Sequence, residues 1–359
     1  MCMKKSKNWL VFISLVFVVI IRYFSSAPEY QEGDKIRITS RVYTDPVKYD
    51  TSQYLRLAGL KVYLPKFPEI YYGNKIVVEG TVREGRLDGA ILVEVTESDN
   101  FFLGVRQRLI SFYQETLPEP FAGLISGVTL GAKGALSNDF WQKVVNTGVA
   151  HVVVASGMNV TFVASFLIGV FAIFLSRKKA IPFVILGIIL YLFISGFDAP
   201  LVRAAIMATI AFSAQETGRL VTAARALVIS ALVMLIINPN WVTDIGFMLS
   251  FVATGSLLLF ERKIRKKLEK VPEFLKEGLS TSLAAQIGVT PILFVTFGQF
   301  NILSPVINAL VLWTVPYIMF LGAIGGLVGL VVPLMGKVIL YFSYPFVWWF
   351  SSVVTLFNF

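Results

Sequence analysis

The side chains that could do chemistry in this chain are few, and most of them interrupt apolar stretches. They are His151, Ser156, Asn159, Asp198, Arg203, Glu216, Arg219, Arg225, Asp244, Gln286 and Asn308. Ionisable and strongly polar groups are costly inside a membrane segment, so they usually face a water-filled cavity or another part of the protein. These residues are therefore the candidates for a polar path between helices.

Arg203 is the most informative of these residues because it sits in the stretch GFDAPLVRAAIMA, five residues after Asp198. Gly196 and Pro200 favour irregular backbone there, which is tolerated at membrane depth only beside water or protein. One interpretation is a fixed positive charge that receives phosphate oxygens, to which the planar guanidinium is well suited. The other is an ion pair between Asp198 and Arg203 that fixes two helix ends. The two interpretations are compatible, and both stay open here.

The stretch HVVVASGMNV places His151, Ser156 and Asn159 around a Ser-Gly break at the start of an apolar segment. A helix interrupted there exposes backbone N–H groups that can meet an anion. Ser156 beside His151 also fits a hydrolase, but the chain lacks a Gly-x-Ser-x-Gly elbow and an evident acidic partner. We therefore expect no catalytic residue. Asp244 and Gln286 suit interhelical hydrogen bonds as well as a place along the path.

Motifs for nucleotide hydrolysis and metal binding are missing from the sequence. It contains no GxxxxGK[ST], no HExxH and no pair of cysteines, because Cys2 is its only cysteine and His151 its only histidine. We expect a protein that is not an enzyme, has no cofactor and no metal site, and draws its energy from elsewhere.

The elements that must position these residues are apolar helices. Hydrophobic residues make up 56% of the 359 residues and charged residues only 15%, and the mean hydropathy is +0.72, which predicts a polytopic α-helical membrane protein. The hydrophobic segments run over 150–176, 181–197, 200–214, 221–237, 244–260, 279–297, 302–332 and 337–358. Segment 302–332 is too long for one simple span and contains Pro305 and Pro316, so we expect a break or re-entrant turn there.

The net charge of +10 is unevenly placed. Residues 28–100 hold ten Lys or Arg and twelve Asp or Glu, so the positive excess lies elsewhere. It gathers beside apolar runs, at Lys4, Lys5, Lys7, Arg177, Lys178, Lys179, Arg262, Lys263, Arg265, Lys266, Lys267 and Lys270. The positive-inside rule explains this pattern in one orientation, with the N-terminus inside and residues 28–149 outside. A nucleic-acid footprint is the alternative.

The N-terminal part divides into an anchor and a small β domain. Residues 9–21 are apolar, and we favour an uncleaved membrane anchor within 1–27 over a signal peptide cleaved near Ser25-Ser26-Ala27. Residues 28–100 show short alternating runs with turns at Gly73-Asn74, Glu84-Gly85 and Asp88-Gly89, which predicts an exported OB-like β-barrel. Such barrels often bind single-stranded nucleic acid through aromatics and a basic groove. The tyrosines that could stack are Tyr43, Tyr49, Tyr54, Tyr63, Tyr71 and Tyr72. The acidic balance favours a structural or gating role instead.

Residues 101–149 connect the β domain to the apolar segments. Phe101, Val105, Leu109 and Phe112 recur at helical spacing, with Arg106 and Arg108 off that stripe, as in a helix at a membrane interface. Residues 117–149 predict further helices and turns at the membrane edge. Residues 150–359 then form the multi-span domain.

Four stretches, in order, resemble the ComEC competence family. They are LISGVTLGAKGALSNDFWQKVVNTGVAHVVVASGMNV, GFDAPLVRAAIMA, RALVISALVMLIINPNWVTDIGFMLSFVATGSLLL and AAQIGVTPILFVTFGQFNILSPVINALV. The resemblance covers about residues 28–332. It differs at Asn159, where the family often has a second histidine. Many members also carry a metallo-β-lactamase-like nuclease domain, and we expect none in these 359 residues, which contain one histidine.

The resemblance implies a channel in a bacterial cytoplasmic membrane that carries single-stranded DNA inward during natural transformation. It implies membrane lipids as surroundings, and as partners a separate nuclease, a DNA receptor and a cytoplasmic DNA motor. The candidates for the DNA path are His151, Ser156, Asn159, Asp198, Arg203, Arg225, Asp244, Gln286 and Asn308. A transporter for another anionic polymer or lipid-linked precursor is the main alternative, and a membrane scaffold without a conducted substrate is a further one.

Overall fold

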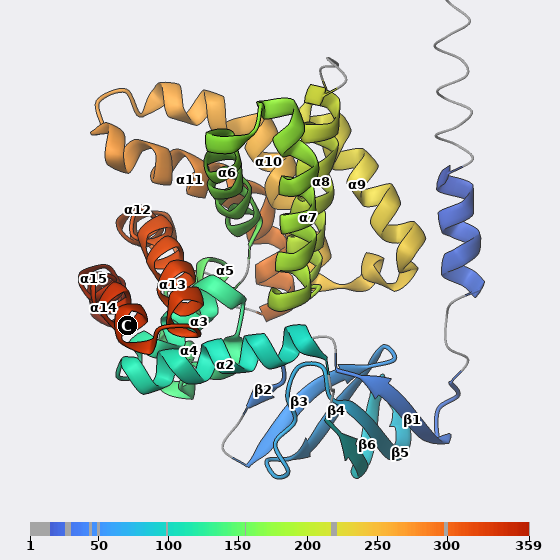
Figure 1. Cartoon of the computed structure of the whole chain (residues 1–359). Coiled ribbons are helices and arrows are strands. Elements are labelled where there is room, and N and C mark those ends of the chain that lie inside the picture. Colours follow the sequence, from blue (N-terminus) through green and yellow to red (C-terminus); the bar gives the residue numbers. More distant parts are fainter. Residues whose placement is uncertain are drawn as a thin grey trace, which may run out of the picture.

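The computed structural model describes residues 15–25, 30–42, 45–48, 51–97, 100–154, 156–216, 221–297 and 301–358. A six-stranded sheet forms one end of the molecule, and helices form the rest (Figure 1). Several predictions lie outside the described residues: those for Lys4, Lys5 and Lys7, for 9–14 and 26–27, for Tyr43, Tyr49 and Arg219, and for the side chain of Glu216.

The strands have short, alternating sequences. They are β1 (Lys35–Arg41), β2 (Val47–Lys48), β3 (Ser52–Leu57), β4 (Leu60–Pro65), β5 (Lys75–Arg83) and β6 (Arg86–Thr96), in the sheet order β1-β5-β6-β4-β3-β2. Neighbours pair antiparallel except β4 and β6, which are parallel. Every second residue of β4 is buried, in a core that also contains Leu55, Ile70 and Val78. The period-2 pattern thus reports the buried face correctly.

Two-residue turns join the hairpins. Glu84 and Gly85 both have positive φ angles between β5 and β6, as the sequence predicted for that turn. Ala58 and Gly59 do the same between β3 and β4, a hairpin that the sequence analysis missed. The turn expected at Asp88-Gly89 is wrong, because both residues lie inside β6, beside a register irregularity in its pairing with β5.

The two outermost strands of the sheet are consecutive in the chain. β1 pairs with β5 at one edge and β2 pairs with β3 at the other, although only five residues separate β1 from β2. The sheet therefore has to curl until its two edges approach each other, which encloses one core.

The helices follow in a single run from residue 101. They are α2 (Phe101–Thr116), α3 (Phe121–Leu130), η1 (Lys133–Ala135), α4 (Asn138–Asn146), α5 (Ala150–Val153), α6 (Gly157–Phe174), α7 (Arg177–Ser195), α8 (Ala199–Glu216), α9 (Ala223–Ile237), η2 (Pro239–Thr243), α10 (Ile245–Lys267), α11 (Glu273–Phe297), α12 (Ser304–Leu312), α13 (Val315–Gly329), α14 (Pro333–Tyr341) and α15 (Tyr344–Leu356). A further helix covers Leu15–Ser25.

By length and composition, four helical stretches of the described chain could cross a membrane, in the regions of α6, α7, α10 and α11. Up to six could do so if each of two bent pairs counts as one span. The break expected in 302–332 is present, as a 45° bend between α12 and α13. A 48° bend between α14 and α15 was not expected. α8 and α9 form where apolar segments were predicted, but they are shorter than the other candidates.

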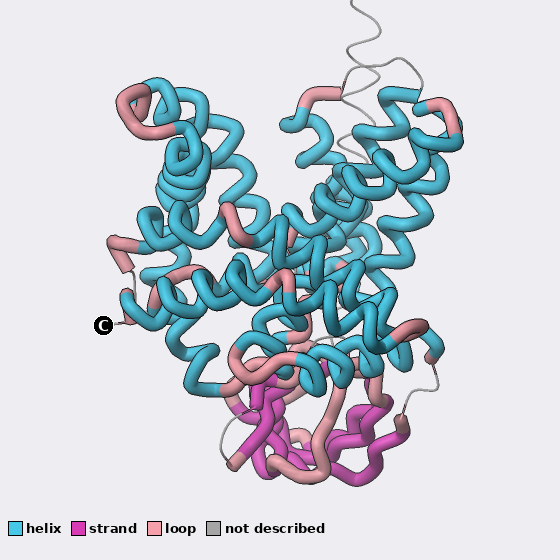
Figure 2. The backbone as a smooth tube through the Cα atoms, turned by 60° about the vertical axis from the view of Figure 1, so that its left-hand side comes forward, coloured by secondary structure: helices cyan, strands magenta, loops and turns pink. Residues whose placement is uncertain are grey.

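The helices pack around two apolar cores. One joins α2–α5 to α12–α15, and the other joins α6–α10. Nine of the ten residues of α3 are buried in the first core, so this short helix lies inside the fold. The α6–α7 and α10–α11 turns lie on the side of the helical region away from the sheet (Figures 1 and 2).

Candidate functional site

Arg203 lies where three helices meet. It projects from α8, and its Nε donates a hydrogen bond of 2.7 Å to Ser250 Oγ on α10. Its Nη1 lies 3.5 Å from Met207 Sδ one turn along, and its Cζ lies 5.9 Å from the centre of the Phe251 ring. A Cβ atom placed on Gly157, the first residue of α6, would lie 3.4 Å from Nη2. The guanidinium therefore stands directly against the N-terminus of α6.

The N-terminus of α6 is left open by its own cap residue. Ser156 occupies the N-cap position with extended backbone, but its side chain makes no capping hydrogen bond. Its Oγ instead donates to Asn159 Oδ1 at 3.2 Å. The first N–H groups of a helix have no intrahelical partner and carry a partial positive charge. Since Arg203 adds a full positive charge beside them, an anion that reaches this junction is attracted by both groups.

No carboxylate of the described residues forms an ion pair with Arg203. The predicted Asp198–Arg203 pair is wrong: Asp198 Oδ2 lies 3.4 Å from Lys133 Nζ of η1 instead. Asp198 precedes α8, and its backbone oxygen accepts the N–H bonds of Leu201 and Val202, so it helps to start that helix. The charge of Arg203 therefore remains uncompensated by protein in this part of the fold.

Asn159 is fully buried beside this junction and fixes the start of α6 on α3. Its Nδ2 donates to the backbone oxygen of Val128 at 2.7 Å and lies 3.4 Å from Tyr191 Oη. Tyr191 in turn donates to the backbone oxygen of Thr129 at 3.0 Å. Both acceptors lie near the end of α3, so Asn159 holds three helices together.

A second polar cluster surrounds Asn308 on α12, which is also buried. Its Nδ2 donates to Ser282 Oγ at 3.0 Å and to Ser304 Oγ at 3.2 Å. Its Oδ1 is buried without a hydrogen-bond partner among the described residues. Ser304 also approaches the backbone oxygen of Gly148 at 3.4 Å, which ties α12 to the turn before α5.

The other predicted site residues do not join either cluster. His151 is exposed on the short helix α5, and Arg225 is exposed near the start of α9. Asp244 caps α10, where its Oδ1 accepts the N–H of Phe247 at 2.8 Å. Gln286 is partly exposed on α11. The structure thus gives Asp244 a clear local role and brings together only some of the candidates.

Arg106 is a buried residue that the sequence analysis placed wrongly. It was expected off the apolar stripe of α2, yet it is only 4% exposed. Its Nη2 forms an ion pair of 2.7 Å with Asp45 Oδ2 of the sheet domain, and its Nη1 donates to three backbone oxygens of the helical region. No local spacing in the sequence signals that Arg106 is buried. Its partners lie 24 to 89 residues away, out of reach of any local pattern.

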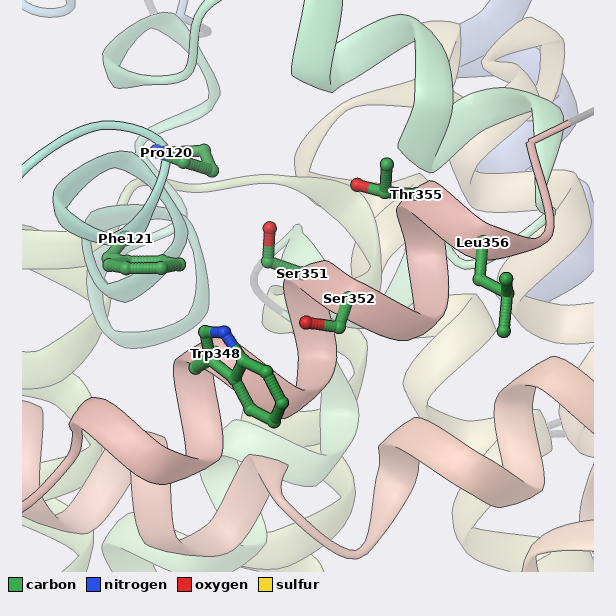
Figure 3. A pocket seen from close by; sticks show the side chains of 7 residues that line it. All are labelled: Pro120, Phe121, Trp348, Ser351, Ser352, Thr355 and Leu356. Atoms are coloured by element: carbon green, nitrogen blue, oxygen red, sulfur yellow. The ribbon is translucent and has the colours of Figure 1, made fainter.

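Two hollows lie apart from the Arg203 junction. One, of about 390 Å³, lies between the start of α3 and α15, with Pro120 and Phe121 on one side and Trp348, Ser351, Ser352 and Thr355 on the other (Figure 3). It contains no ionisable side chain and carries no chemistry. The second, of about 220 Å³, lies between the sheet and α2 and borders Arg106. The described residues contain no group of three or more His, Cys, Asp or Glu side chains placed to hold a metal ion.

Comparison with known proteins assigns the family. A family described as Competence protein matches residues 128–359, which is more than half of the chain. The chain belongs to this family. ComE operon protein 3 of Bacillus subtilis (strain 168) is 29% identical over 238 residues, which make up 64% of this chain. The match covers 30% of the length of that relative. No solved structure matches the chain.

The four stretches that pointed to this competence family meet at the two polar clusters. Gly157 of the first, Arg203 of the second and Ser250 of the third come together at the α6 N-terminus. Ser304 and Asn308 of the fourth meet Gly148 of the first at the other cluster. The family match and the similarity to ComE operon protein 3 confirm the resemblance to ComEC proteins at the level of family. Residues that lie far apart in the chain thus form the two polar clusters, one at Arg203 and one at Asn308.

Proposed function

We propose that this competence protein carries single-stranded DNA across a bacterial cytoplasmic membrane, with Arg203 as a phosphate contact on the path. The observation that carries the proposal is the half-buried guanidinium of Arg203, which has no carboxylate partner among the described residues and faces the N-terminus of α6. Two positive groups held against each other favour an anion between them, and a phosphate diester is the anion that recurs along DNA. The family is one of competence proteins.

The distribution of basic residues supports an orientation in this membrane. Arg177, Lys178 and Lys179 start α7, and the cluster from Arg262 to Lys270 ends α10. Both turns lie on the side away from the sheet (Figure 1). By the positive-inside rule that side faces the cytoplasm, so we place the N-terminus inside and residues 28–149, with the sheet, outside.

The sheet domain suits the outer mouth of such a path. Its edges are brought together by β1 and β2, and we propose that it forms an OB-like barrel. One face carries Tyr54 opposite Tyr63, with ring centres 5.1 Å apart, and Arg56 opposite Lys61. Aromatic rings with interleaved cations are what single-stranded nucleic acid stacks on. The domain as a whole has more acidic than basic residues, but this one face carries two cations and two aromatic rings.

Scattered charge fits conduction better than a dense basic channel would. A polyanion that met many cations at once would be held too tightly to leave, whereas a few isolated contacts allow it to advance. Among the candidates in the helical region, Arg203 is the cation that the structure places at a junction of helices.

The test is uptake of fluorescent double-stranded DNA in a strain that lacks the gene, complemented with the protein or its variants. We expect Arg203→Ala to insert normally but to lower cytoplasmic uptake about 10- to 100-fold, the value of a hydrogen bond to a charged group. Arg203→Lys keeps the positive charge but lacks the planar guanidinium that binds two phosphate oxygens at once, so its uptake should lie between those of the wild type and Arg203→Ala. Arg108→Ala removes an exposed arginine from α2 and serves as the matched control.

The outcomes separate the proposal from its rival. Full uptake with Arg203→Ala would remove the phosphate contact from the proposal. Normal cytoplasmic uptake in the strain without the gene would instead favour a transporter for another anionic polymer or lipid-linked precursor.

A further inference from the structure

The joint between the sheet and the helices is built around one buried guanidinium. Arg106 Nη1 donates to the backbone oxygens of Leu130 at 2.6 Å, Ile194 at 2.9 Å and Ser195 at 2.9 Å. Leu130 ends α3, and Ser195 ends α7. The last carbonyls of a helix lack intrahelical partners and carry a partial negative charge, so both helix ends stabilise the cation.

The two remaining contacts of Arg106 are with the sheet domain. Arg106 Nη2 forms the ion pair with Asp45 Oδ2, and the guanidinium lies 5.1 Å from the centre of the Tyr72 ring. If Asp45 moves away, Arg106 Nη1 keeps its three carbonyl partners at the ends of α3 and α7, which stabilise part of the charge, while loss of the carboxylate from the buried pair costs free energy. The contacts of Arg106 that break when the sheet moves are therefore the Asp45 bond and the Tyr72 ring contact, while its contacts to the helical region remain.

Space for such a movement lies beside the bond. The hollow of about 220 Å³ is bordered by Asp45, Tyr72, Arg106 and Gln107. Tyr71 at its edge donates to Glu69, a hydrogen bond that raises the pKa of Tyr71 to about 12 and keeps its hydroxyl neutral. The hollow thus lies between the sheet domain and α2, next to the bond between Asp45 and Arg106.

The joint leads directly to the turn that precedes α8. Gly196 follows Ser195 with a φ of +104°, and a Cβ atom there would lie 3.5 Å from the Tyr72 ring. Asp198 comes next, paired with Lys133, and α8 then carries Arg203. The position of the sheet and the start of α8 are therefore linked through Arg106 and Tyr72.

We propose that Arg106 is a positioning residue, that its bond to Asp45 is a latch which holds the sheet on the helices, and that this latch opens during transport. The proposal rests on the proposed function, because the opened joint would admit DNA next to the turn that leads to Arg203. Arg106 itself stays with the helical region, and Asp45 leaves with the sheet.

A reversible cross-link across the joint tests the latch in the full chain. Pro46 of the sheet domain and Gly134 of η1 are neighbours across the joint, since a Cβ atom on Gly134 would lie 3.8 Å from the backbone oxygen of Pro46. The protein would carry Pro46→Cys, Gly134→Cys and Cys2→Ser, so that no other cysteine is present. Arg37→Cys with Glu79→Cys, partners across β1 and β5, is a matched pair that links the sheet only to itself.

We expect oxidation of the joint pair to lower DNA uptake at least about tenfold, with recovery after reduction, while DNA bound at the cell surface and the sheet-only pair stay unaffected. Full uptake by the cross-linked protein would overturn the latch. No uptake even when reduced, with normal membrane insertion, would count against the proposed function instead.

Asp45→Asn gives a second readout that does not depend on blocking transport. It removes the charge but keeps the shape, so the joint pair should cross-link about tenfold more slowly, the change expected from loss of one charge-assisted hydrogen bond. Uptake should persist because Arg106 retains its three carbonyl partners. An unchanged rate of cross-linking would show that Asp45 does not hold the sheet.

Discussion

The Nη2 atom of Arg203 lies 3.4 Å from the point where a Cβ atom would stand on Gly157, and the Cβ atom of Ala204 lies 3.3 Å from that point, so α8 packs closely against the start of α6. Gly157→Ala should need a shift of a few tenths of an ångström and lower uptake slightly. Gly157→Val should displace the guanidinium and lower uptake about tenfold, the value of one charged hydrogen bond. Membrane levels and DNA uptake of both variants check this. Equal effects of Ala and Val would contradict the geometry.

The Ser250 hydroxyl orients the same guanidinium, because it accepts from Arg203 Nε at 2.7 Å. Ser250→Ala should lower uptake less than Arg203→Ala, since the charge stays in place while its orientation is lost. Ser256→Ala, at another buried serine of α10, is the control and should have no effect on uptake. The two variants should differ in uptake measured side by side at equal membrane levels. An effect of Ser256→Ala as large as that of Ser250→Ala would indicate general disturbance of the helix.

Asn159 is expected to stabilise the fold more than it acts on DNA, because its amide is buried and already bonded to the Val128 oxygen. Asn159→Leu leaves that oxygen unpaired and should destabilise the protein by about 1–3 kcal/mol. The midpoint of thermal unfolding in detergent measures this. Val160→Ala, at the adjacent buried position on α6, is a comparison in which no hydrogen bond is lost. An unchanged midpoint for Asn159→Leu would show that the bond contributes nothing.

Part of the candidate site could be predicted from the sequence, because a charged residue inside an apolar stretch can be recognised without knowledge of the fold. Arg203 was found in this way, whereas the break in 302–332 followed from the length of that segment and its prolines. The partner of Asp198 was not, since Lys133 lies 65 residues earlier and no local spacing points to it. Arg106 was missed for a related reason: its helix was judged by its most apolar stripe, while its partners are carbonyls at the ends of α3 and α7. Helix ends meet through tertiary packing, which sequence spacing does not encode.

Asp244 was predicted to lie along the path because it begins an apolar segment, but in the structure it caps α10. Its Oδ1 accepts from the N–H of Phe247 at the start of α10. Asp244→Ala should destabilise the protein by about 1 kcal/mol. Asp244→Asn, which also caps well, should leave both the unfolding midpoint and DNA uptake unchanged. A strong loss of uptake with Asp244→Asn would assign the carboxylate a direct role and overturn this interpretation.

The outer face of the sheet yields the last prediction, which separates stacking from charge. Tyr54 and Tyr63 are cross-strand partners with ring centres 5.1 Å apart, and Arg56 and Lys61 form the next pair on the same face. Because stacking of one base on an aromatic ring is worth about 1–3 kcal/mol, Tyr54→Ala with Tyr63→Ala should weaken binding of short single-stranded DNA at least about tenfold. Tyr54→Phe with Tyr63→Phe retains the rings and should retain the affinity. Arg56→Ala with Lys61→Ala should reduce the salt dependence of binding, because two fewer phosphates are neutralised. Fluorescence anisotropy with the purified full chain at several salt concentrations measures all three. If the alanine pair at the tyrosines binds as tightly as the phenylalanine pair, this face does not stack bases.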